Sequence, residues 1–138
     1  MALIAPHGAD ELRPLIVDDA RRGELEAEAL TLPSLAMSSA AAANAVMMGA
    51  GYFTPLTGYM NLADALSVTE NMRTTDGLFW PVPVVNLAES CPAEPGQRLA
   101  LTDPNREGQP LMAVMTVEAI ETFSDEDVAT ILDKVFRT

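Results

Sequence analysis

Few residues of the chain have the type and spacing that chemistry requires. Gly49-Ala50-Gly51 lacks the third glycine of a dinucleotide-binding loop, and no GxxxxGK[ST] sequence occurs that could cradle a phosphate. The one histidine, His7, and the one cysteine, Cys91, have no neighbouring ligands at the spacing of a metal site. We therefore predict no catalytic, cofactor-binding or metal-binding residue in this chain.

The charge balance limits the partners. The 138 residues carry 20 acidic and 8 basic side chains, a net charge of −12, and Lys134 is the sole lysine. Such a surface repels phosphates, whereas nucleic-acid binding depends on Lys and Arg that neutralise them. The composition predicts no nucleic-acid partner.

The same sequence indicates a compartment. A single cysteine cannot form an internal disulfide, which is typical of a reducing environment. The start lacks the basic-then-apolar order of a secretory signal, and no apolar run reaches about 18 residues. We expect a cytoplasmic protein without a membrane partner.

Helix signals lie in four places. Residues 18–30, DDARRGELEAEAL, predict a solvated helix with local ion pairs and no site. An alanine-rich helix begins after a serine cap at 38 or 39 and ends at Gly49. Asn61 caps a short helix whose mostly apolar face contains positions 62, 65, 66 and 69. Ser124 opens an amphipathic helix with apolar positions 128, 131, 132, 135 and 136.

Extended segments alternate with these helices. Pro33 makes residues 32–37 a candidate edge strand, and Asp76-Gly77 predicts a turn into a strand at 78–85. Further strands are expected at 98–102 and at 111–117, and the second is expected to be central because both its faces are apolar. Together the elements predict one α+β domain over residues 1–138, built on a small barrel-like sheet with flanking helices.

Long phrases of the sequence resemble a known family. They read GYFTPLTGYM at 51–60, SVTENMRTTDGLFWPVPV at 67–84 and LALTD at 99–103. In this order they closely resemble the amino-terminal domain of ATP sulfurylase (sulfate adenylyltransferase), and the similarity extends from APHG near the start to VFRT at the end. The departures are conservative, and they fall at Thr54, Tyr59, Thr75 and Phe79.

The resemblance implies a PUA-like β-barrel domain that supports and orients a catalytic domain absent from this chain. The parent family belongs to sulfur metabolism and joins sulfate to the α-phosphate of ATP, supplied as Mg-ATP, releasing pyrophosphate. Its anion-binding donors lie in Gln-x-Arg-Asn and His-x-Gly-His motifs of the catalytic domain, and neither motif occurs here. The implied partner is that catalytic domain, and a homo-oligomer is also open.

Three residues are candidates for contact with that catalytic domain: Arg73, Asp76 and Trp80. Each has a structural alternative. Arg73 and Asp76 more often make an ion pair or stabilise a turn within their own domain. Trp80, a large aromatic in an expected strand, more often fills a core.

Two other functions remain open from the sequence. PUA-like barrels often bind RNA, although the net charge opposes that function and a shared fold is a weak reason to assign it. Salt-sensitive binding of structured RNA would favour this alternative. A free-standing subunit that pairs with a separately encoded catalytic protein would instead co-elute with that protein on size exclusion.

The missing anion-binding donors lead to a prediction about activity. The purified chain is expected to release no pyrophosphate from ATP plus sulfate, because it cannot hold the two anions together. A coupled pyrophosphate assay, with omission of either substrate as the control, measures this. Turnover that requires both substrates would contradict the prediction.

Overall fold

The computed structural model describes residues 3–137, which form two compact units. Unit 1 comprises residues 3–58 and 86–118, and unit 2 comprises residues 59–85 and 119–137. Each unit therefore joins segments that are distant in the sequence. The single domain expected over residues 1–138 stays a prediction.

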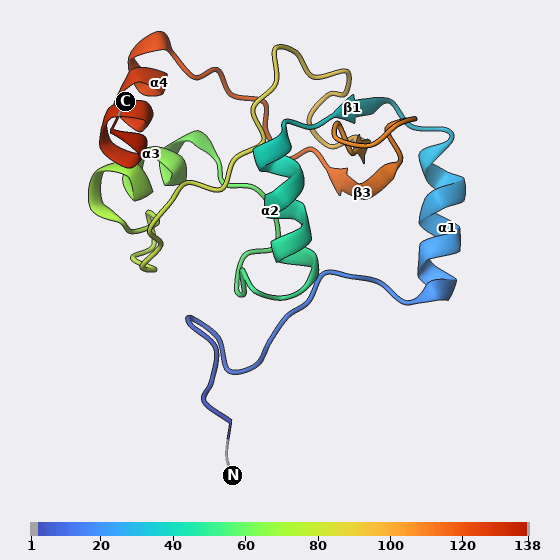
Figure 1. The fold of residues 1–138 in the computed structure, drawn as a ribbon, viewed down its shortest axis with the longest axis horizontal. Coiled ribbons are helices and arrows are strands. Elements are labelled where there is room, and N and C mark those ends of the chain that lie inside the picture. Colours follow the sequence, from blue (N-terminus) through green and yellow to red (C-terminus); the bar gives the residue numbers. More distant parts are fainter. Residues whose placement is uncertain (1–2, 138) are drawn as a thin grey trace. The chain divides into compact units, whose positions relative to one another are not determined.

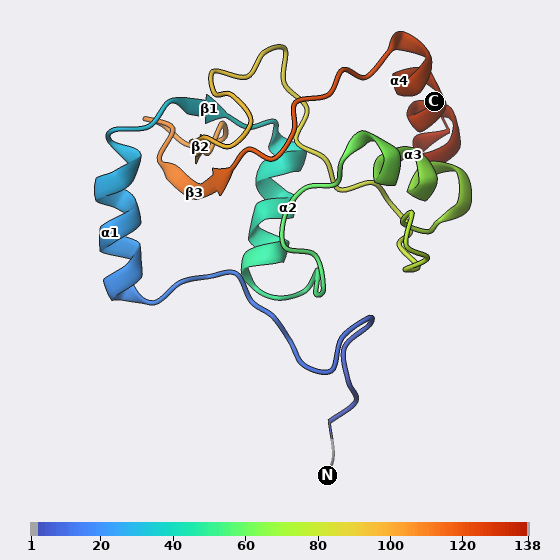
Figure 2. The same cartoon turned by 180° about the vertical axis from the view of Figure 1, so that it is seen from behind.

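Unit 1 contains a three-stranded mixed sheet and two helices (Figure 1). The strands lie in the order β1 (Ser34–Ala36), β2 (Arg98–Thr102) and β3 (Leu111–Thr116), with β1 parallel and β3 antiparallel to β2. Helices α1 (Asp19–Ala29) and α2 (Ser39–Gly49) flank the sheet in both views, and both contact β3 (Figures 1 and 2).

The covered strand is β2 and not β3, so the expectation of a central strand at 111–117 was wrong. Leu99 and Leu101 on one face of β2 and Ala100 on the other are all buried. In the described sheet β3 lies at an edge, and its residues are half-buried or exposed. Its apolar residues on both faces indicated a central position, but pairing partners, which periodicity does not reveal, decide the strand order.

The cap of α2 confirms the prediction made for it, whereas the cap of α1 was not predicted. The Ser38 side chain accepts a hydrogen bond from the backbone N–H of Ala41 at the start of α2. The Asp18 carboxylate accepts from the N–H of Arg21 at the start of α1, 2.8 Å away. Helix α1 buries none of its residues, as expected of a solvated helix, and it continues through Gly23.

Unit 2 packs helix α3 (Leu62–Asn71) against α4 (Asp125–Ile131) and the π-helical turn η1 (Leu132–Phe136). Asn61 caps α3 through its side chain, as predicted. Ser124 and Asp127 form a reciprocal capping box at the start of α4, with three acids in its first turn. Lys134 forms an ion pair with Glu70 of α3, which joins the two helical segments.

The strand predicted at 78–85 is absent from the described structure. Its one piece of β pairing is an isolated antiparallel bridge between Arg73 and Phe79. The physical reason is that Pro81 and Pro83 have no backbone N–H to donate to a neighbouring strand. The segment is irregular instead, with a bend at residues 81–82.

The predicted α+β class is confirmed, with three strands and four α-helices in the described part of the chain. The strands predicted at 98–102 and 111–117 form, as does the edge strand after Pro33. A closed barrel stays a prediction. Over residues 3–137 no helix has the length and apolar content needed to cross a membrane.

The burial of β2 predicts a stability effect. Leu99→Ala is expected to lower the free energy of unfolding by about 2–5 kcal/mol, because Leu99 is 1% exposed and its loss leaves a cavity. Urea unfolding followed by circular dichroism measures the change. The matched control is Leu30→Ala at an 89% exposed leucine, where a change above about 0.5 kcal/mol is not expected. Equal effects of the two substitutions would contradict the role of β2.

Candidate functional site

The turn at residues 73–79, which contains two of the three candidate residues, is a small hydrogen-bonded hairpin. Helix α3 ends at Asn71, and its C-cap Met72 adopts the left-handed conformation, with φ of 53°, which reverses the chain. The N–H of Thr74 then donates to the carbonyl of Leu78 at 2.8 Å. The N–H of Gly77, whose φ is 93°, donates to the carbonyl of Thr74. The positive φ explains why a glycine closes this turn.

Arg73 and Asp76 both stabilise this turn. The guanidinium of Arg73 donates to the carbonyl of Gly77 at 3.1 Å. The carboxylate of Asp76 accepts from the hydroxyl of Thr74, and this hydrogen bond holds the pKa of Asp76 below its ordinary value. Both side chains are exposed. The turn-stabilising alternative is therefore confirmed, and the predicted contact with a catalytic domain stays a prediction.

Thr74 is the buried centre of the turn. It is 7% exposed, and its hydroxyl donates to Asp76 while it accepts from the N–H of Leu78 at 3.1 Å. One side chain thereby satisfies a part-buried backbone donor and orients an exposed carboxylate. No chemical pattern marked Thr74 in the sequence, because its role depends on the turn being formed.

Trp80 and its neighbour Phe79 have opposite exposures. Trp80 is 7% exposed and its backbone N–H donates to the carbonyl of Met72, so it has the buried position that was preferred for it. Phe79 is 46% exposed and Met72 is 54% exposed. Adjacent residues of an extended segment point to opposite sides, so the exposed aromatic is Phe79. No pattern in the sequence marked Phe79 as the exposed aromatic residue.

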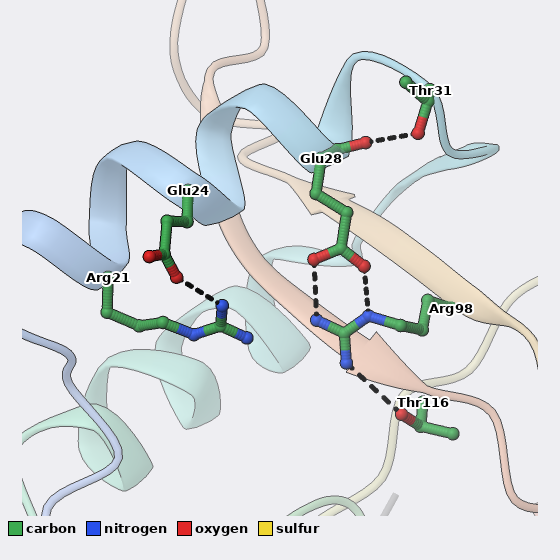
Figure 3. A network of polar contacts seen from close by, with 6 residues as sticks. All are labelled: Arg21, Glu24, Glu28, Thr31, Arg98 and Thr116. Atoms are coloured by element: carbon green, nitrogen blue, oxygen red, sulfur yellow. Dashed lines mark hydrogen bonds and ion pairs between the residues drawn. The ribbon is translucent and has the colours of Figure 1, made fainter.

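Among residues 3–137, acids pair with four of the eight basic side chains. In α1, Arg21 pairs with Glu24 at 2.7 Å and Arg22 with Glu26 at 3.4 Å. Figure 3 shows the first pair beside a second, longer-range contact in which Arg98 of β2 meets Glu28 of α1. These side chains neutralise one another.

The contact between Arg98 and Glu28 joins residues 70 positions apart. Two guanidinium nitrogens contact the two carboxylate oxygens, one of them at 3.1 Å, and a third reaches the Thr116 hydroxyl of β3 at 3.5 Å (Figure 3). The hydrogen bond from Arg98 lowers the pKa of Glu28. Arg98 of β2 therefore links α1 and β3, and its guanidinium is paired with the Glu28 carboxylate.

The predicted absence of metal-binding and cofactor-binding residues stays a prediction. In the range 3–137, no group of three or more His, Cys, Asp or Glu side chains is arranged to hold a metal ion. His7 lies exposed in a turn and Cys91 is half-buried in a loop. Anion binding needs converging cations, and Arg21, Arg22, Arg98 and Lys134 contact acids of their own unit.

Comparison with known families now defines the class. A family model described as a PUA-like domain matches residues 4–138. The chain belongs to the PUA-like domain family. Its α+β class agrees with that assignment.

Within the PUA-like family, the curated relatives of this chain are sulfate adenylyltransferases. The sulfate adenylyltransferase of Alcanivorax borkumensis is 59% identical over 140 residues, covering 100% of this chain and 35% of the relative. The sulfate adenylyltransferase of Allochromatium vinosum is 53% identical, and the alignment covers 99% of this chain and 35% of the relative. The chain therefore matches the N-terminal part of sulfate adenylyltransferases and spans about a third of their length.

A solved structure is also similar. It is a hexameric APS kinase from Thiobacillus denitrificans, with a TM-score of 0.71 and 33% sequence identity. The alignment covers 91% of this chain and 24% of that chain. The likeness again concerns one part of a larger protein.

The geometry of the 73–79 turn generates a prediction. Thr74→Val is expected to destabilise the chain by about 1–3 kcal/mol, because valine has the same shape as threonine but offers no acceptor to the part-buried N–H of Leu78. It should also raise the pKa of Asp76 towards its ordinary value. Chemical unfolding and an NMR titration of the Asp76 carboxyl measure the two effects.

The lowered pKa of Asp76 also determines in which direction the stability of the chain changes with pH. A lowered pKa in the folded state adds stability above the unfolded pKa of about 3.9, and this is lost as the pH falls through the folded value. The difference between wild type and Thr74→Val should therefore shrink in acid. Thr122→Val, at an exposed threonine, is the control and should have neither effect. An unchanged Asp76 titration in Thr74→Val would contradict this role of the hydroxyl.

Proposed function

We propose that this chain is the non-catalytic N-terminal domain of a sulfate adenylyltransferase, which supports and orients a catalytic domain. The observation that carries the proposal is the extent of the match, since the whole chain aligns with only 35% of the Alcanivorax borkumensis enzyme. The remaining part of such an enzyme then holds Mg-ATP and sulfate and forms adenosine 5′-phosphosulfate and pyrophosphate, a step of sulfate assimilation.

The electrostatics of the described residues support this division. Joining sulfate to ATP brings two anions together and needs cationic donors aimed at the developing charge. Here the net charge is −12, and Arg21, Arg22, Arg98 and Lys134 are engaged by acids. The same charge opposes the RNA-binding alternative.

Several finer features belong to this proposal. Membership of the PUA-like family supports a barrel-like arrangement around the three described strands. The single cysteine and the ATP-dependent reaction support a cytoplasmic location. The hexameric state of the related APS kinase supports a homo-oligomeric enzyme. Arg73 and Asp76, held in the 73–79 turn, would contact the catalytic domain together with exposed Phe79 rather than buried Trp80.

A chimeric enzyme tests the proposal. Residues 1–138 replace the aligned N-terminal region of the Alcanivorax borkumensis enzyme. The chimera is expected to make pyrophosphate from Mg-ATP and sulfate within about tenfold of the parent rate, a loss of only about 1.4 kcal/mol. A pyrophosphate assay, with thermal unfolding of the same samples, measures this.

Two controls make the result specific. The parent enzyme sets the reference rate, and a parent lacking its aligned N-terminal region should be less stable and less active. A truncated parent as stable and active as the intact one would contradict the supporting role. A folded chimera without activity would contradict the assignment of this chain to that enzyme.

A further inference from the structure

Helix α2 is apolar on the side that faces away from its own unit. Ala41, Ala42 and Met48 are buried on one side of the helix. Residues 43, 46, 47 and 50 follow the i, i+3, i+4, i+7 spacing and are exposed on the opposite side. Val46 is 58% exposed and Met47 is 37% exposed. A helix that is apolar all round is normally buried all round.

Two further apolar residues adjoin the C-terminal end of α2. The N–H of Ile16 donates to the carbonyl of Gly49 at 3.1 Å, and the N–H of Tyr52 donates to the carbonyl of Met47 at 3.0 Å. Ile16 is 78% exposed and Tyr52 is 74% exposed. In Figure 1 the segment containing Ile16 passes beside the lower end of α2. We define the α2 face as Ile16, Val46, Met47 and Tyr52.

Helix α1, the other helix of unit 1, exposes charged residues and not an apolar side. Both helices have 11 residues, but α1 carries six charged side chains and α2 carries none. The solvated helix has the composition expected of one in water, and α2 does not. A contiguous exposed apolar surface is typical of an interaction site.

We infer that the α2 face is the docking surface for the part of a sulfate adenylyltransferase that lies outside this chain, an inference that rests on the proposed function. About 65% of the Alcanivorax borkumensis enzyme lies outside the aligned region, which is ample chain to cover one helix face. A second copy is disfavoured, because each copy brings a net charge of −12 to the contact. The matching surface is apolar.

Thiol labelling tests this inference. Val46→Cys and the matched control Leu30→Cys, each combined with Cys91→Ala, are placed in the isolated chain and in the chimera. Leu30 is 89% exposed and lies at the end of the solvated helix α1. The samples react with iodoacetamide, and mass spectrometry of the peptides gives the rate at each position.

The expected result is a difference between the two contexts. In the isolated chain both thiols should react at similar rates. In the chimera the thiol at position 46 should react at least about tenfold more slowly, because contacts exclude the reagent, while position 30 stays unchanged. Val46→Asp should also weaken thermal stability of the chimera but not of the isolated chain.

The contrary outcomes are distinct. Equal rates at position 46 in the isolated chain and an active chimera would overturn this inference and leave the proposed function standing. An inactive but folded chimera would count against the proposed function itself. Sedimentation of the isolated chain tests the remaining case, which is a dimer. If the chain dimerises as its concentration rises and the thiol at position 46 becomes protected, the α2 face binds a second copy and the inference is overturned.

Discussion

Backbone pairing along both edges of β2 is the constraint on which unit 1 depends. Its residues pair with β1 on one side and β3 on the other, so segments more than 60 residues apart meet on one strand. Because the strand is enclosed on both edges and both faces, Leu99, Ala100 and Leu101 have almost no exposed surface. The end of β2 also carries Arg98, whose contact with Glu28 holds α1 against the sheet.

Half of the basic side chains are paired with acids of their own unit. Acidic residues outnumber basic ones. Two arginines of α1 form ion pairs with glutamates of the same helix, and Lys134 pairs with Glu70 in unit 2. Exposed pairs of this kind contribute little stability. A guanidinium already held by a carboxylate has fewer donors left for a second anion.

Several local features of the fold were predictable because their causes are local. Ser38, Asn61 and Ser124 cap helices by reaching N–H groups three residues ahead, and Pro33 precedes an edge strand. The failed prediction at 78–85 had a local warning in Pro81 and Pro83, which remove two donors. For the candidate site, Asp76-Gly77 indicated the turn correctly. Neither the hydroxyl of Thr74 at its centre nor the exposure of Phe79 could be inferred without the folded hairpin.

The sequence by itself determined the helices and most of their caps, the acidic balance and the resemblance to sulfate adenylyltransferases. Each of these depends only on residue types and on residues that are close together in the sequence. The tertiary structure alone decided that β2 is the covered strand, that Arg98 meets Glu28, and that one apolar side of α2 stays exposed. Those features depend on which distant segments come together. Period and propensity describe one element at a time, so they cannot specify the partner of a strand or the covering of a helix.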